Sequence, residues 1–249
     1  MDNILEIKNL KKTYGKKNVL DGINLKLEKG KILGLMGPNG SGKTTLLKCI
    51  MGLIKANEGE ILIDGKKVGV ETKKIISYLP DAYHLYDNLT IEDTANLYKD
   101  FYDDFNMRVC KELFEFMKIP KEGYSDKLSK GMKERLLLAL TLSRDTKLYI
   151  LDEPIEGVDP IAKDMILSAI IKTVDIGRTI IITTHQIGDL ENLFDRAAFI
   201  QRGQILLEED AEDLRDKYKK KMVDLYKEIF VIWLSFWNMH WKDQGDFFS

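Results

Sequence analysis

Short apolar runs broken by polar turns fill the first third of the chain. The runs predict β-strands at residues 4–10, 19–20, 23–27, 32–36, 60–63 and 75–79. From 91 to 143 the apolar positions change to helical spacing, with Leu136, Leu137 and Leu140 on one expected inward face. We therefore expect a helical subdomain, at about 85–145, inserted into a body that begins with strands.

Strands and helices alternate in the second half of the chain. The pattern predicts a strand at 148–151, a helix that begins at Pro160 with Asp159 as its N-cap, a strand at 179–183, and a hairpin at 197–207. Such alternation is typical of a largely parallel sheet with helices on both faces. The expected fold class is therefore α/β.

Length and composition narrow the possible classes only a little. The chain has 249 residues, 44% of them hydrophobic, which suffices for one large α/β domain with an insertion or for two small domains. The formal net charge is −2 and the basic residues are scattered, so nothing favours binding to nucleic acid. Cys49 and Cys110 lack metal-ligand spacing, and we expect both to be reduced thiols. The first residues resemble no signal peptide, so we expect a cytoplasmic protein.

A glycine-rich loop lies between a predicted strand and a predicted helix at 45–51. Residues 37–44 read Gly-Pro-Asn-Gly-Ser-Gly-Lys-Thr and match the phosphate-binding pattern G-x-x-x-x-G-K-[ST]. Glycines let the backbone N–H groups curl around phosphate oxygens, and the helix adds the positive end of its dipole. Lys43 can reach the outer phosphates, and the Thr44 hydroxyl can bind Mg²⁺. A plain glycine-rich turn is the alternative, but the strand–loop–helix context indicates a nucleoside triphosphate. The candidate nucleotide-binding residues here are Gly37, Asn39, Gly40, Ser41, Gly42, Lys43, Thr44 and Thr45.

Two adjacent carboxylates end the predicted strand at 148–151. In open α/β sheets ligands bind at the carboxyl ends of strands, where Asp152 and Glu153 are expected. Side chains alternate along a strand, so the two acids can take different roles. Asp152 can hold Mg²⁺, and Glu153 can polarise the water that attacks the γ-phosphate. Taken alone, the pair could be a solvated acidic turn, but the upstream phosphate loop favours the catalytic interpretation.

The chain resembles the ATP-binding subunits of ABC transporters. Residues 128–132, Leu-Ser-Lys-Gly-Met, resemble the ABC signature, usually written LSGGQ, and precede Asp152-Glu153 by the spacing typical of that family. The resemblance extends from Leu5 to about Leu214. It implies a P-loop NTPase fold of ABC type, with an N-terminal antiparallel β part and the inserted helical subdomain. It also implies that Ser129 and Gly131 contact nucleotide. These two residues could otherwise simply start a helix, with Ser129 as its N-cap.

Three more positions take their expected roles from the resemblance. Tyr14 lies where the family stacks adenine, and a loop aromatic covering apolar surface is the alternative. Residues 156–159 correspond to the loop that crosses the dimer interface and include Asp159, a further nucleotide-binding candidate. His185 follows the predicted strand at 180–184 and corresponds to the histidine that contacts the γ-phosphate. Taken alone, such a histidine is more often a hydrogen-bonded structural residue.

The sequence departs from the family at two motifs. Lys130 replaces the first glycine of the signature and Met132 its last glutamine. Such a lysine could add charge beside a γ-phosphate or simply point outward. Asp81 replaces the glutamine that links Mg²⁺, the attacking water and the membrane partner in the family. As a hard oxygen donor it could still ligate Mg²⁺, so we expect Asp81 to act as a metal ligand and catalytic residue.

The C-terminal stretch resembles the family least. We expect a nucleotide-binding domain at 1–216 and a helical tail at 217–249. Trp233, Trp237 and Trp241 are four residues apart and would form one helical stripe. The apolar run from Ile229 to Trp237 is shorter than the roughly 20 residues that span a bilayer. Packing on the body, a dimer helix and contact with a membrane surface all remain open.

The resemblance implies an ATP-binding and ATP-hydrolysing subunit that powers a membrane transporter, expected to export peptide, drug or lipid. One chain carries one phosphate loop and one signature, so it needs a second ATP-binding subunit, identical or different. The pathway is expected in a separate transmembrane permease that docks near Tyr83 to Asp93. This chain would then lie on the inner face of the membrane, with ATP and Mg²⁺ as cofactors and no nucleic acid partner.

Two other functions agree less well with the sequence. A soluble ABC ATPase acting on nucleic acid, the ribosome or cluster assembly would usually bring tandem domains, coiled coils or basic regions, and the sequence has none of these. An inactive regulatory binder is disfavoured because Lys43, Asp152, Glu153 and His185 are all present.

Overall fold

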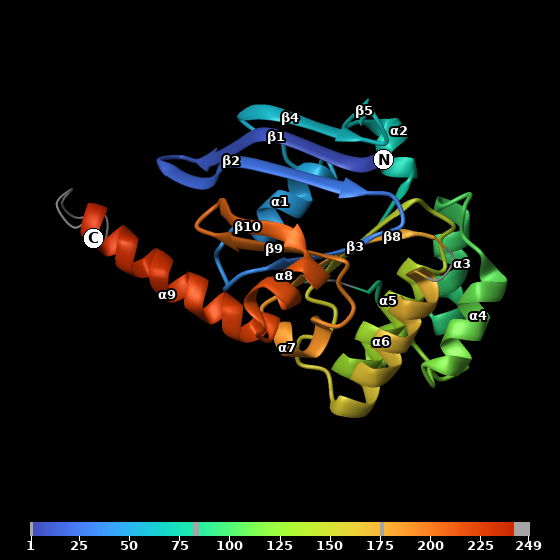
Figure 1. The fold of residues 1–249 in the computed structure, drawn as a ribbon. Helices are drawn as coiled ribbons and strands as arrows, with labels where there is room; N and C mark the ends of the chain where they lie inside the picture. The colour runs from blue at the N-terminus through green and yellow to red at the C-terminus, as the bar shows by residue number, and fades with distance from the viewer. Residues whose placement is uncertain (1, 82–84, 175–176, 242–249) are drawn as a thin grey trace.

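Two stacked β-sheets and their flanking helices make up the molecule (Figure 1), a computed structural model that describes residues 2–81, 85–174 and 177–241. The strands are β1 (Asn3–Tyr14), β2 (Lys17–Glu28), β3 (Ile32–Met36), β4 (Glu58–Ile63), β5 (Lys66–Lys67), β6 (Ile76–Leu79), β7 (Leu148–Asp152), β8 (Thr179–Thr184), β9 (Arg196–Gln201) and β10 (Gln204–Asp210). The helices are α1 (Lys43–Ile50), α2 (Val70–Lys74), α3 (Ile91–Phe101), α4 (Met107–Phe116), the 3₁₀ turn η1 (Ser125–Lys127), α5 (Lys130–Leu142), α6 (Pro160–Val174), α7 (Ile187–Leu190), α8 (Ala211–Tyr218) and α9 (Met222–Trp241).

The N-terminal sheet is antiparallel, with the order β2-β1-β4-β5. The expected separate strands at 19–20 and 23–27 are one strand, β2. Gly22 takes a φ of +73°, and the pairing of β1 with β2 shifts register between Leu10↔Ile23 and Lys12↔Leu20. A bulge at a glycine carries the strand through the apparent turn, which a periodicity argument cannot detect.

The central sheet is largely parallel, as predicted, with the order β10-β9-β3-β8-β7-β6. β9, β3, β8, β7 and β6 run parallel, and β10 pairs antiparallel with β9 at one edge. The strands β3, β7 and β8 are buried along their whole length. They are therefore apolar runs rather than alternating ones, because both faces of the sheet are covered.

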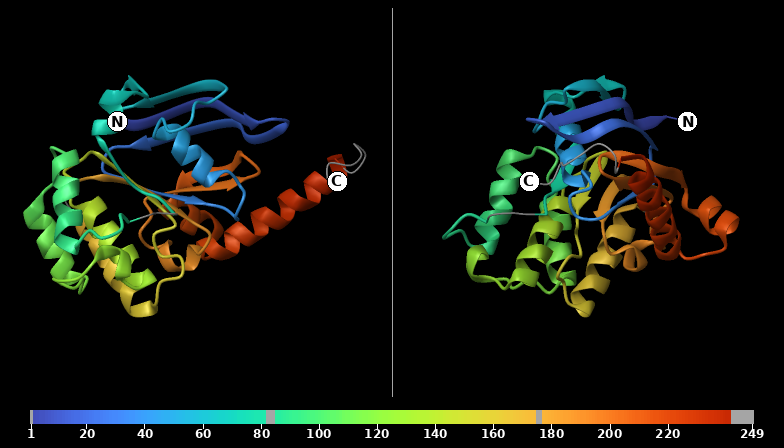
Figure 2. Two further views of the ribbon diagram at one scale, coloured as in Figure 1. Left: turned by 180° about the vertical axis from the view of Figure 1, so that it is seen from behind. Right: turned by 90° about the vertical axis from the view of Figure 1, so that its left-hand side faces the viewer.

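Each face of the central sheet has its own core. Leu35 and Ile150 pack toward the antiparallel sheet, with α1 between the two sheets (Figure 2). Tyr149 and Ile182, which point the opposite way, pack against the helices of the other face, among them α5 and α6. The period-2 alternation of a strand thus divides one sheet between two cores.

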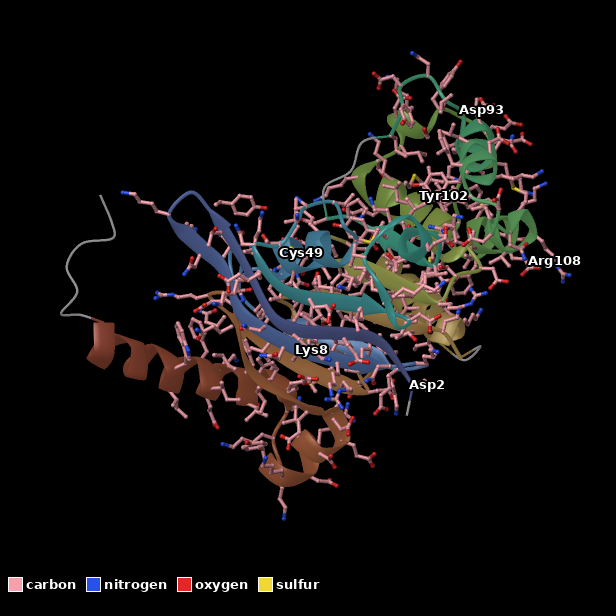
Figure 3. All side chains as sticks on the ribbon, turned by 90° about the horizontal axis from the view of Figure 1, so that it is seen from above. Asp2, Lys8, Cys49, Asp93, Tyr102 and Arg108 are labelled. Carbon is pink, nitrogen blue, oxygen red and sulfur yellow. The ribbon has the colours of Figure 1, made fainter. Side chains whose placement is uncertain are left out.

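The helical insert lies between β6 and β7 in the chain, where the sequence predicts it. Its helices begin at well-defined caps. Thr90 forms a capping box with Asp93 at the start of α3, and Ser129 accepts a hydrogen bond from the Met132 N–H at the start of α5. Figure 3 shows Asp93 and Tyr102 on the α3 side of this subdomain and Arg108 on α4.

The long helix α9 leaves the body at its C-terminal end (Figure 1). Near its start, the Tyr226 ring packs edge-on against Phe199, with ring centroids 5.3 Å apart, and the Arg202 guanidinium lies 5.3 Å from the centre of the Trp233 ring. The side chains of Trp237 and Trp241 fall outside the described part, so the predicted stripe of three tryptophans stays a prediction. Among the described residues, no helix has the length and apolar character needed to cross a membrane.

Candidate functional site

Several of the predicted site residues, among them Lys43, Glu153 and His185, converge where β3, β7 and β8 end. These strands are parallel neighbours, so their carboxyl ends share one edge of the sheet. The loop 37–42 follows β3, Glu153 follows β7 and His185 follows β8. Residues more than a hundred positions apart in sequence therefore meet at this edge.

The glycines of the loop are required for different structural reasons: a close approach of other backbone atoms at some positions and a positive φ at others. A Cβ at Gly37 would lie 2.3 Å from the Ile200 carbonyl oxygen, and one at Gly42, where φ is +111°, 2.9 Å from that of Val19. At Gly40, with φ +77°, a Cβ would meet nothing within 4 Å, so this face of the loop is open. The Ser41 Oγ is buried without a hydrogen-bond partner in the described structure, and Gly42 places no side-chain cap on α1. Unmet donors at a helix start suit phosphate oxygens.

Lys43 is buried and bends back over its own loop. Its Nζ donates to the Gly37 carbonyl at 2.7 Å and lies 3.1 Å from the Glu153 Oε1. Both of these side chains are less than a tenth exposed. A phosphate in the loop carries negative charge, as Glu153 does. It could therefore replace Glu153 as the charge-assisted hydrogen-bond partner of Lys43.

Asp152 is nearly inaccessible and only half satisfied. Its Oδ1 accepts a 2.6 Å hydrogen bond from the Thr183 hydroxyl, whereas its Oδ2 has no partner in the described structure. Burial raises the pKa of Asp152, and hydrogen bonds from Thr183 and Thr44 oppose that rise. The charge of the exposed Asp81 raises it further, which places the two carboxylates within electrostatic reach. A buried carboxylate oxygen beside a threonine hydroxyl and a second carboxylate is a donor set that fits Mg²⁺.

Glu153 lies just beyond the end of β7 rather than on it. Its φ of +52° is left-handed, and its N–H donates to the backbone oxygen and the hydroxyl of Thr183, at 3.2 and 3.0 Å. Strand alternation was therefore the wrong reason to separate it from Asp152. A strained left-handed residue, held by β8, turns the second carboxylate to a different side.

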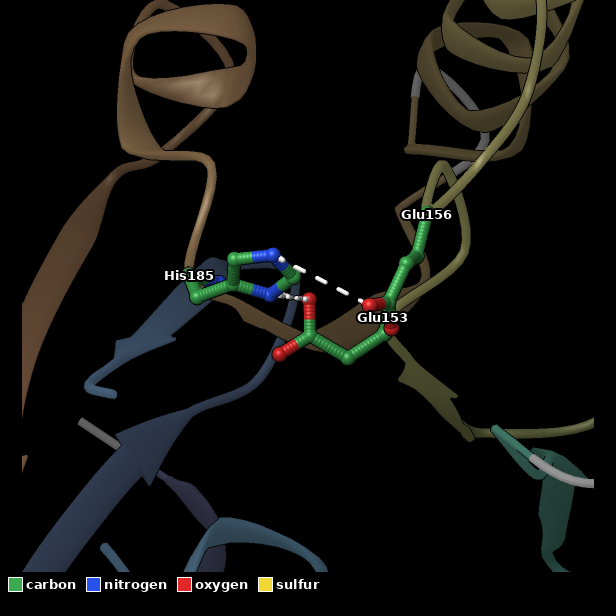
Figure 4. Close-up of side chains that lie close together, drawn as sticks. All are labelled: Glu153, Glu156 and His185. Atoms are coloured by element: carbon green, nitrogen blue, oxygen red, sulfur yellow. Dashed lines mark hydrogen bonds and ion pairs between the residues drawn. The ribbon is translucent and has the colours of Figure 1, made fainter. Parts of the chain in front are cut away.

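His185 faces two carboxylates, those of Glu153 and Glu156, which lie on the same side of its ring (Figure 4). Its Nδ1 is 3.0 Å from the Glu153 Oε2, which also accepts from the His185 backbone N–H at 3.2 Å. Its Nε2 is 3.9 Å from the Glu156 Oε1. Sequence reasoning did not propose Glu156 or Thr183 as site residues. The only signal available for Thr183 was a hydroxyl near the end of a β-branched strand.

The remaining candidates lie apart from this group. Ser129 and Asp159 cap α5 and α6, and the Asp159 Oδ1 accepts from the Ala162 N–H at 3.0 Å. Gly131 is half-buried with open space where a Cβ would be. The Tyr14 ring is half exposed at the end of β1. Within the described residues no hydrogen bond or ion pair joins Tyr14, Ser129 or Asp159 to Lys43 or Glu153.

Comparison with known proteins gives one consistent answer. Residues 20–156 match the ABC transporter family. The chain is 32% identical to the lantibiotic transport ATP-binding protein SrtF of Streptococcus pyogenes, over 88% of this chain and 98% of that one. It is also 32% identical to the Nod factor export ATP-binding protein I of Rhizobium etli, over 86% of this chain and 70% of that one.

A solved structure extends the likeness to three dimensions. The dimeric ATP-binding cassette MJ0796, in a post-hydrolysis state bound to ADP and Pi, is 25% identical and superimposes with a TM-score of 0.74, covering 83% of this chain and 98% of that one. The family match over residues 20–156 includes the phosphate loop, Asp152 at the end of β7 and Glu153 directly after it. The chain belongs to the ABC transporter family, as an ATP-hydrolysing cassette.

Proposed function

We propose that the chain is the ATPase subunit of an exporter, and that it binds MgATP between its own phosphate loop and the signature of a second ATP-binding subunit. The observation that carries this proposal is the convergence of Lys43, Asp152, Glu153 and His185 at one edge of the central sheet. Relatives named for lantibiotic transport and Nod factor export support the exporter class. The dimeric cassette with ADP and Pi supports the paired arrangement.

The phosphate loop would bind the nucleotide through two kinds of group: those without a hydrogen-bond partner in the described structure, and Lys43, whose present partners a phosphate can replace. In the described structure the Ser41 hydroxyl has no hydrogen-bond partner and α1 has no side-chain cap, so this hydroxyl and the first N–H groups of α1 would donate to phosphate oxygens. Lys43 would exchange the Gly37 carbonyl and Glu153 for a phosphate. Tyr14, half exposed, would stack on the base with little discrimination between ATP and GTP.

Mg²⁺ would be held by Thr44, Asp152 and Asp81. The bound ion would neutralise charge on the phosphates. Burial is the main cause of the raised pKa of Asp152, and the charge of the exposed Asp81 adds to it, so a bound cation would offset both effects. The unpartnered Oδ2 of Asp152 is the natural ligand atom.

Glu153 would act as the base for the attacking water. When Lys43 binds a phosphate instead, the Oε1 of Glu153 loses its ion pair and becomes available to the water. The Oε2 of Glu153 stays fixed by the backbone N–H and the ring of His185. His185 would therefore orient Glu153 and contact the γ-phosphate from the end of β8. The left-handed backbone of Glu153, held by the hydrogen bond from its N–H to Thr183, turns this carboxylate toward His185.

The α3 side of the helical subdomain would meet a separate permease in the membrane, with the ATPase on the inner face. Residues 81–104 contain seven acidic residues and one lysine, although the whole chain is close to neutral. Tyr86 and Phe101 are among the most exposed aromatics there. Cytoplasmic loops of membrane proteins are rich in Lys and Arg, which complements such a surface. Part of the expected contact, from Tyr83, lies outside the described residues.

Glu153→Gln tests the proposed chemistry. The variant should bind MgATP with wild-type affinity, lose at least about 100-fold in hydrolysis, and accumulate as an ATP-bound dimer, because the base alone is removed. Equilibrium nucleotide binding, phosphate release and sedimentation measure the three properties. Glu115→Gln, on the exposed side of α4, is the matched control and should behave as wild type. Hydrolysis at the wild-type rate would refute the base assignment.

A further inference from the structure

Lys130, which replaces the first glycine of the signature, points toward the catalytic loop of its own chain. It is the first residue of α5, and its Nζ lies 3.8 Å from the Glu134 Oε1 one turn along the helix. The same ammonium lies against Gly157, where a Cβ would come within 3.1 Å of Nζ. Lys130 therefore bridges the start of α5 and the loop that follows β7.

That loop, residues 153–159, is a tight turn that carries two of the charged groups at the site. The Glu156 N–H donates to the Glu153 carbonyl at 3.1 Å, and the Val158 N–H to that of Ile155 at 3.4 Å. Gly157 has a φ of +73°. Glu156, next to the point that Lys130 touches, faces the Nε2 of His185. Movement of the turn at Gly157 would thus displace the partners of His185.

Electrostatic attraction also favours the position of Lys130 beside the turn. Glu134 is mostly buried, and its Oε2 has no hydrogen-bond partner in the described structure. Burial raises the pKa of Glu134, Lys130 lowers it, and the charge of Glu156 raises it again. Two carboxylates, one on α5 and one on the turn, therefore lie within electrostatic reach of each other with an ammonium beside them. Without that ammonium they would push the turn away from α5.

We propose that Lys130 is a positioning residue for hydrolysis: it fixes the turn 153–159 against the start of α5 and so keeps the Glu153 carboxylate at Nδ1 of His185 and the Glu156 carboxylate near its Nε2. The proposal rests on the role of Glu153 given above. It assigns a function to a residue at which this chain departs from its family. It also ties the signature of one subunit to the catalytic carboxylate of that same subunit.

Lys130→Met in the full chain removes the charge and keeps most of the side-chain length. We expect the kcat for ATP hydrolysis to fall by about threefold to tenfold, the KM for ATP to stay within about twofold, and amide exchange at Gly157 and Val158 to quicken. Lys130→Arg should restore most of the rate. Lys127→Met is the matched control, because Lys127 is equally exposed, at 74%, and within the described residues its one ion pair is with the neighbouring Asp126. It should leave rate and exchange unchanged.

A double-mutant cycle with Glu134→Gln separates positioning from other roles. If Lys130 acts through the charges around the turn, Lys130→Met should cost less in the Glu134→Gln background than in the wild type. A raised KM with unchanged exchange at the turn would instead assign Lys130 to a nucleotide phosphate and overturn the proposal. Uniformly faster exchange with a lower Tm, or no change at all, would overturn it too. Amide exchange reports the Lys130–Gly157 contact even if Glu153 proves not to be the base.

Discussion

Two buried cations, Lys43 and Arg144, occupy opposite ends of the parallel strands and differ in what surrounds them. Each residue is 5% exposed. Arg144, at the amino ends of β6 and β7, donates to both carboxylate oxygens of Asp104 at 2.9 Å and to the Ile76 carbonyl at 2.6 Å. Its guanidinium also lies 4.0 Å from the centre of the Tyr102 ring.

Lys43, at the carboxyl ends, has partners that a ligand can replace. One is a carboxylate with a proposed catalytic role, and the others are carbonyls of the loop itself. Close by, the Ser41 Oγ and the Asp152 Oδ2 have no hydrogen-bond partner among the described residues. The planar guanidinium of Arg144, hydrogen-bonded to groups of the protein itself, fixes structure. The compact ammonium of Lys43, with partners that a ligand can replace and polar groups without partners beside it, indicates a binding site. Burial alone does not distinguish the two.

The largest expected effect is on folding, from Arg144→Ala. The change leaves Asp104 and two backbone carbonyls without their cation and separates the helical subdomain from β6, so the free energy of unfolding should fall by about 3 kcal/mol. Chemical denaturation measures this loss. ATP affinity of the folded fraction should stay near wild type. Arg108→Ala, which removes an exposed pair with Glu112, should barely move the midpoint. A stable Arg144→Ala protein would break the contrast.

Lys43→Ala should show the opposite pattern, with a loss of binding rather than of folding. The phosphates lose a charge-assisted donor, so MgATP affinity should fall by about 10–100-fold. Isothermal titration with MgATP gives the affinity, and thermal unfolding without nucleotide gives the stability. If the variant binds MgATP as tightly as wild type, the phosphate-loop assignment fails.

Asp81 should have an intermediate effect, confined to the metal. If Asp81 ligates Mg²⁺, the substitution Asp81→Ala removes one carboxylate ligand. The Mg²⁺ concentration needed for half-maximal hydrolysis should therefore rise several-fold. Asp81→Gln, which restores the family residue, should keep substantial activity. Magnesium titrations of hydrolysis in the three proteins give the comparison. Identical curves would remove Asp81 from the catalytic site and leave it a surface or permease contact.

The smallest effect concerns pH and a surface cluster near the amino ends of the strands. Hydrogen bonds from Lys147 and then Lys29 lower the pKa of Asp64 to about 2. Because the folded pKa lies below the unfolded one, near 4, this stabilisation is complete above about pH 4 and is lost as the pH falls toward 2. Asp64→Asn, tolerated at a φ of +49°, should flatten the acid limb of the stability curve. An unchanged slope between about pH 4 and 2 would contradict the assignment.

Local pattern predicted much of the fold because its causes are local. The buried strands β3, β7 and β8, the caps Ser129 and Asp159 and the hairpin turning at Arg202-Gly203 all follow from side-chain periodicity and turn chemistry. The bulge at Gly22 did not, because it depends on pairing with another strand. The order of strands in the central sheet likewise depends on contacts distant in sequence.

The sequence by itself determined the phosphate loop, because residues 37–44 are consecutive in the chain. It also determined the types of residue available for catalysis, because Asp152 and Glu153 are adjacent. Only the tertiary structure decided that Thr183 holds both acids, that Glu156 faces His185 and that the Lys130 ammonium lies beside Gly157. Each of these contacts joins segments carried on different strands or helices. Their geometry is set by how the sheet and helices pack, and no local pattern encodes that packing.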